Sequence, residues 1–190
     1  VGQEGKDVVW VPTPDEVVQR MLQVAKVTPK DIVYDLGAGD GKIAIAAGKL
    51  GATSVGIEYN PDVAKLAQCY VQAEKLTGKT RIIQGDVFES DFRDATVVTM
   101  YLLPELNLRL LPKLLKDLKP GTRIVSHAFN MGDWKPDQTI DPVAKCKDYC
   151  NAFLWIVPAK VAGTWKAPEG RLELKQNFQV FTGRLVNGKV

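Results

Sequence analysis

Short apolar runs and longer amphipathic stretches alternate along the first two thirds of the chain. The short runs are rich in β-branched residues, as expected for strands that a sheet buries on both faces. The longer stretches place apolar residues three or four positions apart, which is typical of helices with one buried face. The pattern therefore predicts strands at 32–36, 53–57, 80–84, 95–101 and 122–128, and helices at 14–27, 42–50, 61–76 and 105–118.

This alternation predicts an α/β fold, in which a Rossmann-like, doubly wound and mostly parallel sheet carries helices on both faces. The rhythm changes after Phe129. Residues 132–148 are rich in proline, aspartate and lysine and predict a long loop. Four alternating segments between 151 and 185 predict a C-terminal antiparallel β extension that continues or extends the sheet. We expect one domain over 1–190, made of an N-terminal segment and helix (1–30), a central core (31–130), and the loop with its β extension (131–190).

Two helices begin with recognisable signals. Thr13 is a favourable N-cap residue, and Pro14 suits the first position of the helix that follows. Asn60 and Pro61 repeat this arrangement before the third helix. We therefore expect Thr13 and Asn60 to cap these two helices with their side chains.

A glycine-rich loop follows the first predicted strand. Gly37, Gly39 and Gly41 lie directly between this strand and the next helix. Glycine tolerates positive φ and lets a ligand lie against bare main chain, and the amides that open a helix attract an anion. An ordinary tight turn is the alternative interpretation.

Spacing decides which ligand the loop suits. The dinucleotide fingerprint G-x-G-x-x-G would need its third glycine at position 42, where Lys42 stands. The second strand ends at Glu58, and an acid there accepts hydrogen bonds from ribose hydroxyls in nucleotide folds. The core therefore predicts a site for an adenosine cofactor other than a dinucleotide.

Composition and charge narrow the class of partner. The net charge is +3 and no long run of like charge occurs, so no nucleic-acid partner is expected. No stretch approaches about 18 uninterrupted apolar residues, so no membrane span is expected. The chain begins with Val1 rather than methionine. We therefore expect a cytoplasmic protein or, if a presequence was removed, an exported or periplasmic one; nothing in the pattern indicates an oligomeric state.

Three cysteines are present. Cys69 lies in a helical pattern and is expected to be a small core residue. Cys146 and Cys150 lie four positions apart, which is compatible with two unpaired thiols, a local disulfide or a metal site. Because His127 is the only histidine and no second cysteine pair exists, no metal is expected.

The sequence DLGAGDG, from Asp35 to Gly41, resembles motif I of the class I S-adenosylmethionine (SAM) methyltransferases. Glu58 and Asp86 stand where that family holds the ribose and the adenine amino group. The resemblance implies SAM as cofactor. It implies cofactor contacts at Asp35, Gly37, Ala38, Gly39, Gly41, Glu58, Tyr59, Asp86 and Val87.

Further segments are similar to the small seven-strand protein lysine methyltransferases, which include archaeal broad-specificity enzymes and mitochondrial enzymes acting on the ATP-synthase c-subunit and the adenine nucleotide translocase. These segments are WVPTP at 10–14, VVTMYLLPELN at 97–107 and LKPGTRIVSHAFNMGDW at 118–134. Similar bacterial SAM-dependent methyltransferases exist, some preceded by export signals. The resemblance covers about 8–135 and implies N-methylation of lysine in a protein.

Three other functions stay open at this stage. The β extension at 161–190 has no counterpart in the lysine enzymes and could form the lid of a small-molecule methyltransferase. A protein that binds SAM without turnover is a second alternative. A nicotinamide-dependent dehydrogenase ranks last because of Lys42. Since no Asn-Pro-Pro-Tyr follows the fourth strand, methylation of amide or base nitrogens is disfavoured.

The acceptor should lie beyond the carboxyl ends of the strands, where the strand order reverses. Tyr101 and His127 follow strands four and five and are predicted to be catalytic, although both could simply close the ends of buried strands. Residues that we expect to contact the methyl acceptor are Trp10, Thr13, Glu105 and Trp134.

Overall fold

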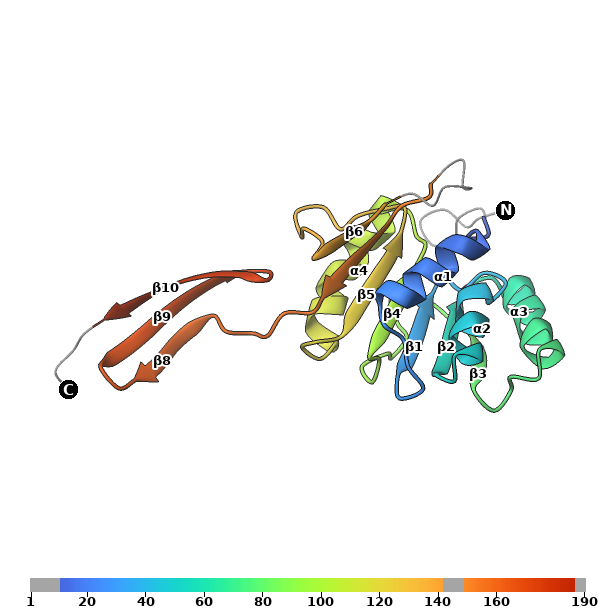
Figure 1. Cartoon of the computed structure of the whole chain (residues 1–190), viewed down its shortest axis with the longest axis horizontal. Helices are drawn as coiled ribbons and strands as arrows, with labels where there is room; N and C mark the ends of the chain where they lie inside the picture. The colour runs from blue at the N-terminus through green and yellow to red at the C-terminus, as the bar shows by residue number, and fades with distance from the viewer. Residues whose placement is uncertain (1–10, 142–148, 187–190) are drawn as a thin grey trace.

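The computed structural model describes residues 11–141 and 149–186. A seven-stranded sheet forms the body, in the order β3-β2-β1-β4-β5-β7-β6 (Figure 1). The first five strands are parallel, and β7 lies antiparallel between β5 and β6. The expected doubly wound, mostly parallel sheet is therefore confirmed. Its strands are β1 (Ile32–Leu36), β2 (Thr53–Glu58), β3 (Thr80–Gln84), β4 (Val97–Met100), β5 (Arg123–His127), β6 (Gln138–Ile140) and β7 (Ala152–Ile156).

Helices cover both faces of this sheet (Figure 1). Side chains alternate along β1, so that Val33 faces one apolar cluster and Tyr34 and Leu36 face another. The cluster around Val33 includes α1 (Asp15–Val24) and α2 (Lys42–Lys49), and the other includes α4 (Pro104–Asp117). A third cluster packs α3 (Pro61–Ala73) against α2 and β3. No helix in the part of the chain that the structure describes is both long and apolar enough to cross a membrane.

Local signals predict some boundaries and miss others. Asn60 caps α3 as expected, since its side chain accepts hydrogen bonds from the amides of Asp62 and Val63. The expected loop at 132–148 is wrong in part, because Gln138–Ile140 forms β6. A three-residue strand shows too short an alternation to be recognised, and its pairing with β7 alone defines it.

The strand order reverses between β1 and β4, because the chain runs from β1 outward to β3 and then returns to the other side of β1. Two neighbouring strands therefore send their following loops in opposite directions, which opens a crevice at their carboxyl ends. The loops after Leu36, Glu58 and Met100 border this crevice.

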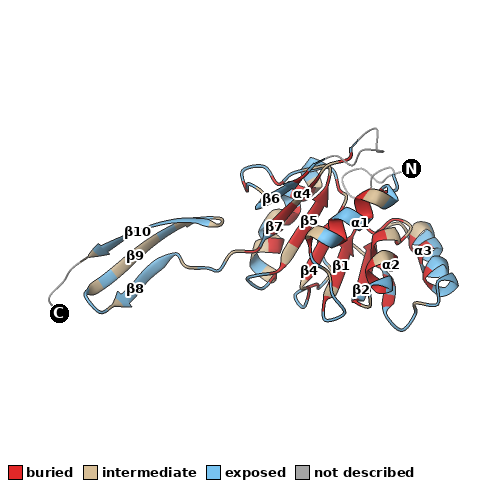
Figure 2. Ribbon diagram, in the orientation of Figure 1, coloured by how far each residue is buried: buried red, intermediate tan, exposed pale blue. Residues whose placement is uncertain are grey.

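A separate three-stranded antiparallel sheet ends the described chain, in the order β10-β9-β8. Its strands are β8 (Gly163–Ala167), β9 (Gly170–Asn177) and β10 (Val180–Val186). It projects from the side of the body that carries β6 and β7 and is largely exposed (Figures 1 and 2). The β9–β10 turn touches the body, where the ring of Phe178 stacks on Trp134 with centroids 5.8 Å apart. The expected antiparallel extension is thus present, partly as β7 and β6 within the main sheet and partly as this second sheet.

Candidate active site

The glycine loop between β1 and α2 exposes bare main chain. Gly37, Gly39 and Gly41 adopt φ values of +75°, +54° and +81°, in the left-handed region that favours glycine. The amides of Gly37 and Ala38 both donate to the carbonyl of Ile57, which ties the loop to the end of β2. A Cβ on Gly37 would lie 2.6 Å from Cδ2 of Leu102, so a larger residue would have to displace this side chain and adopt a strained φ as well.

Glu58 joins this loop to the end of β2. One carboxylate oxygen accepts from the Gly39 amide at 2.8 Å, and the other accepts from the Asn60 amide at 2.9 Å. The residue is buried, with 7% of its surface exposed. Because a carboxylate offers about four acceptor positions, roughly two remain for hydroxyl groups in the pocket. This arrangement suits a ribose that lies on the loop.

Asp35 lies at the end of β1 beneath the loop. Its carboxyl group accepts a hydrogen bond from the Thr99 hydroxyl at 2.8 Å. Burial raises the pKa of Asp35 to about 7, and the negative charges of Asp40 and Glu58 add to this, while the bond from Thr99 opposes it. The carboxyl group therefore loses its proton near neutral pH, and a cation bound beside it would favour this loss.

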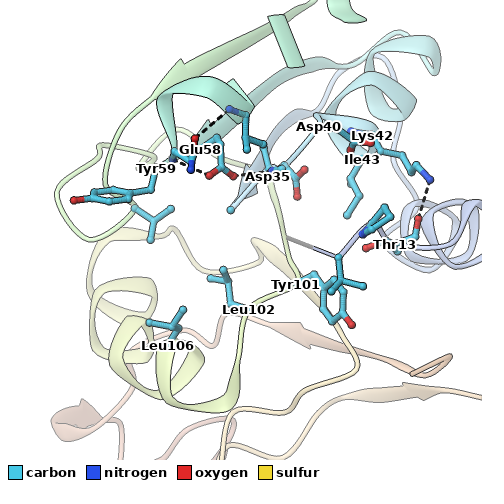
Figure 3. Close-up of a pocket in the computed structure, with 18 of the residues that line it drawn as sticks. Thr13, Asp35, Asp40, Lys42, Ile43, Glu58, Tyr59, Tyr101, Leu102 and Leu106 are labelled. Atoms are coloured by element: carbon cyan, nitrogen blue, oxygen red, sulfur yellow. Dashed lines mark hydrogen bonds between the residues drawn. The ribbon is translucent and has the colours of Figure 1, made fainter. Parts of the chain in front are cut away.

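These residues line a pocket of about 330 Å³, a size in the range of ligand sites. Figure 3 shows Asp35 and Glu58 on one side of it and Leu102 and Leu106 on the other. Asp86 also lines it and accepts from the Phe88 amide at 2.9 Å. Of the predicted cofactor contacts, those in the lining are Asp35, Gly37, Ala38, Gly39, Glu58, Tyr59, Asp86 and Val87.

Gly41 is not part of the lining. It stands at the N-terminus of α2, where a Cβ would lie 3.2 Å from both Ala67 and Ile82. The glycine therefore lets the start of α2 pack closely against α3 and β3. The structure thus gives Gly41 a packing role, and its predicted contact with the cofactor stays a prediction.

The charges of the pocket suit a cation. Asp35, Asp40, Glu58 and Asp86 all line it, which would disfavour the pyrophosphate of a dinucleotide. Lys42 also lines it, but its ammonium group is engaged by the Thr13 carbonyl at 3.1 Å and by Asp15 at 3.0 Å. SAM carries a sulfonium and an ammonium group and no phosphate. The chemistry of the lining therefore fits the predicted cofactor.

Three aromatic rings that lie after β4, after β5 and before β7 also line the pocket: Tyr101, Phe129 and Tyr149. Tyr101 stacks on Phe129 with centroids 6.1 Å apart, and Phe129 contacts Tyr149 at 5.8 Å. Burial, and to a lesser extent the neighbouring Tyr149, keeps the pKa of Tyr101 above its ordinary value. We call these three rings the aromatic wall.

The sequence predicts the aromatic wall only in part. Phe129 follows the fifth predicted strand, within a loop that is expected to face the methyl group, yet no motif singles out its ring. No local signal marks Tyr149, because it reaches the pocket only through the pairing of β7 with β5. Tertiary pairing, rather than a motif, brings this residue to the site.

His127 lies behind the aromatic wall. It is 1% exposed, and it is not among the residues that line the pocket. Its Nδ1 is 3.1 Å from the Thr13 hydroxyl, its Nε2 bonds the Tyr149 carbonyl, and its ring centre lies 4.0 Å from that of Tyr101. We therefore withdraw the prediction that His127 acts directly on the acceptor.

Thr13 lines the pocket, but it does not cap α1. The N-cap residue is Pro14, and no side chain caps the helix. The Thr13 hydroxyl is engaged by His127 instead. A long-range hydrogen bond thus takes the place of the local one that the sequence suggested.

The other predicted acceptor contacts lie elsewhere. Trp134 is fully buried between Trp155 and Phe178, so the prediction that it touches the acceptor is wrong. Glu105 is exposed in the first turn of α4 and is absent from the pocket lining. Trp10, the remaining predicted acceptor contact, lies outside the described residues. Cys146 of the cysteine pair lies outside them as well.

Ala128 separates the buried His127 from Phe129 in the pocket. It has φ of +63°, a conformation that costs a non-glycine residue about 1 kcal/mol or more. We expect Ala128→Gly to stabilise the fold by roughly 0.5–1 kcal/mol, because glycine adopts this conformation without strain. Urea unfolding measures the change, and a loss of stability would contradict it.

Comparison with known proteins agrees with this geometry. The model of the ANTKMT methyltransferase domain matches residues 35–138. A protein-lysine N-methyltransferase from Saccharolobus islandicus is 49% identical over 135 residues, which is 70% of this chain and 84% of that protein. The human lysine N-methyltransferase of the ATP synthase c-subunit is 28% identical over 128 residues, or 67% of this chain and 54% of that protein, so the chain spans about half of its length.

A solved structure has the same fold. It is described as an RNA methyltransferase from Salinibacter ruber in complex with S-adenosyl-L-homocysteine (SAH). It is 45% identical, its TM-score is 0.74, and the match covers 80% of this chain and 96% of that one. The names of these similar proteins therefore agree on methyl transfer and differ on the acceptor.

Proposed function

The chain belongs to the ANTKMT methyltransferase family and is a SAM-dependent methyltransferase, and from this premise we propose that it methylates lysine side chains of a protein. The aromatic wall carries the proposal. The rings of Tyr101, Phe129 and Tyr149 attract an ammonium group through their π faces. The name of the archaeal relative, which is 49% identical, supports the same acceptor.

The residues of this chain would act mainly by holding the cofactor and the acceptor in position. SAM supplies a methyl group on a positively charged sulfur. Glu58 and Asp86 would hold its ribose and adenine, and Asp35 would pair with its ammonium group. Aligning the two reactants and excluding water account for much of the acceleration in such a displacement.

The acceptor amine must lose its proton before it reacts. Tyr101 is poorly suited to remove it as a phenolate, because its raised pKa keeps the hydroxyl protonated near neutral pH. A like charge nearby lowers the pKa of an amine, so the positively charged sulfur of a bound SAM would instead favour the neutral form of a lysine amine beside it. Tyr101 would then orient the amine with its ring and its hydroxyl oxygen.

Incubation with methyl-labelled SAM tests the proposal. We expect label in a lysine-rich protein, and we expect no label in the same protein after its lysines have been acetylated. Total RNA and a mixture of small metabolites serve as competing acceptors. Label in RNA alone would support the acceptor named for the Salinibacter ruber protein and contradict ours, and label in metabolites alone would support the small-molecule alternative.

A further inference from the structure

The side chains of Lys42 and His127 both form hydrogen bonds within the protein, yet neither residue is a predicted contact of the cofactor. Lys42 occupies the place of the missing third glycine, and His127 is the only histidine of the chain. In the structure both side chains end on Thr13, although they come from α2 and β5. One residue of the N-terminal segment is thus held at two different atoms.

Lys42 holds the main chain of Thr13. Its ammonium group donates to the Thr13 carbonyl at 3.1 Å (Figure 3). It also pairs with Asp15 at 3.0 Å. The Lys42 side chain is 34% exposed, and that of Asp15 is 80% exposed. The exposed ion pair with Asp15 contributes little by itself, so the charge-assisted bond to the carbonyl is the stronger half of this contact.

His127 holds the side chain of Thr13. A carbonyl only accepts, so the contact with Tyr149 places a proton on Nε2. The neutral ring then carries no proton on Nδ1, and the Thr13 hydroxyl donates to it at 3.1 Å. Burial keeps the pKa of His127 below its ordinary value, although its bond to the Tyr149 carbonyl opposes this, and the neutral ring is therefore favoured.

The segment held in this way forms part of the pocket. Val11, Pro12 and Thr13 line it together, and they belong to no helix or strand. Thr13 is only 5% exposed. Among the residues that the structure describes, no ladder of main-chain bonds supports residues 11–13, so their position depends strongly on the contacts at Thr13.

We propose that Lys42 and His127 are positioning residues that hold Thr13 across the pocket and thereby set the residence time of the bound cofactor. The proposal rests on SAM binding and is independent of which acceptor the enzyme uses. A ligand leaves such a pocket faster when one wall is released. The association rate of the ligand is not lowered, because substitutions of Lys42 or His127 leave the binding contacts on the glycine loop and at Glu58 unchanged.

Stopped-flow measurement of SAH dissociation tests the contact with Lys42. We expect Lys42→Met to raise the dissociation rate about tenfold, the scale of one lost charge-assisted hydrogen bond, with the association rate unchanged or faster. Lys42→Arg should recover most of the residence time, since its guanidinium can still donate to the carbonyl. Lys49→Met is the matched control, because it removes a lysine of the same helix whose partner, Glu74, lies outside the pocket.

The contact with His127 is tested from both sides. Thr13→Val removes only the hydroxyl, and His127→Gln keeps a donor for the Tyr149 carbonyl while losing the acceptor of Nδ1. If both act through the same bond, each variant speeds SAH dissociation and the double variant is no faster than the quicker single one. Three outcomes would each overturn the proposal. The effects of the Thr13 and His127 variants could be additive, or the dissociation rates of the Lys42 and Thr13 variants could be unchanged. The association rate could also fall by the same factor by which the dissociation rate rises.

Discussion

Replacing Glu58 by alanine is expected to weaken SAH binding about 100-fold, or roughly 3 kcal/mol. The carboxylate has two free acceptor positions at the pocket, and hydrogen bonds to a charged group contribute about 1.5–3 kcal/mol each. The loss also leaves the amides of Gly39 and Asn60 without their acceptor. The glycine loop would then lose its fixed position. Isothermal titration calorimetry with SAH measures the change.

A second acidic residue provides the control for this experiment. Glu74 ends α3 and pairs with Lys49 at 2.8 Å, outside the pocket lining. We expect Glu74→Ala to leave SAH affinity unchanged. A fall of less than about threefold in Glu58→Ala would contradict the role of Glu58, because even one lost hydrogen bond to a charged group exceeds this.

The cofactor half of the site could be predicted from the sequence because its signals are local. Gly37 and Gly39 can adopt a positive φ without strain wherever they stand, and Glu58 ends a strand that directly precedes a capped helix. Parallel strands bring such loops to one rim by topology alone. The strand and helix pattern was therefore sufficient to place these residues together.

The acceptor half depends on contacts between distant segments. Thr13 looks like a helix cap in the sequence, and only the fold brings it to His127, 114 positions away. Trp134 follows the right strand, yet Trp155 and Phe178 bury it, and Phe178 belongs to the second sheet. Tyr149 enters through the antiparallel β7. Spacing along the chain carries no information on such contacts.

The stability of the protein should depend on pH through Asp35, whose pKa in the folded state is about 7 against an ordinary 3.8. A raised pKa means that the protonated side chain suits the fold, so its contribution is present in full below about pH 4. That contribution is lost as the pH rises towards and through 7. A difference of about three pH units between the two pKa values corresponds to at most about 4 kcal/mol of unfolding free energy. Asparagine imitates the neutral acid and accepts from Thr99, so Asp35→Asn should be the more stable protein at pH 8.5.

Urea unfolding of both proteins at pH 4.5 and 8.5 measures this effect. The stabilities should be similar at the lower pH, because Asp35 is then mostly protonated in the folded protein. The difference should grow to roughly 2–4 kcal/mol at the higher pH. Carboxylates distant from Asp35 are the same in both proteins, so their titration cancels in the comparison. A difference that stays constant with pH would show that Asp35 does not titrate in this range.

The same substitution should also impair SAM binding. A cationic cofactor stabilises the charged form of Asp35, so SAM binding to the unsubstituted protein should strengthen as the pH rises through about 7. Below that pH, binding should release a proton, which calorimetry detects in buffers of different ionisation enthalpy. Asp35→Asn should bind SAM more weakly above pH 7. Below pH 7 it should not release the proton that Asp35 gives up on binding. Equal affinities at pH 8.5 would refute the pairing of Asp35 with the cofactor, even if the stability measurements agreed.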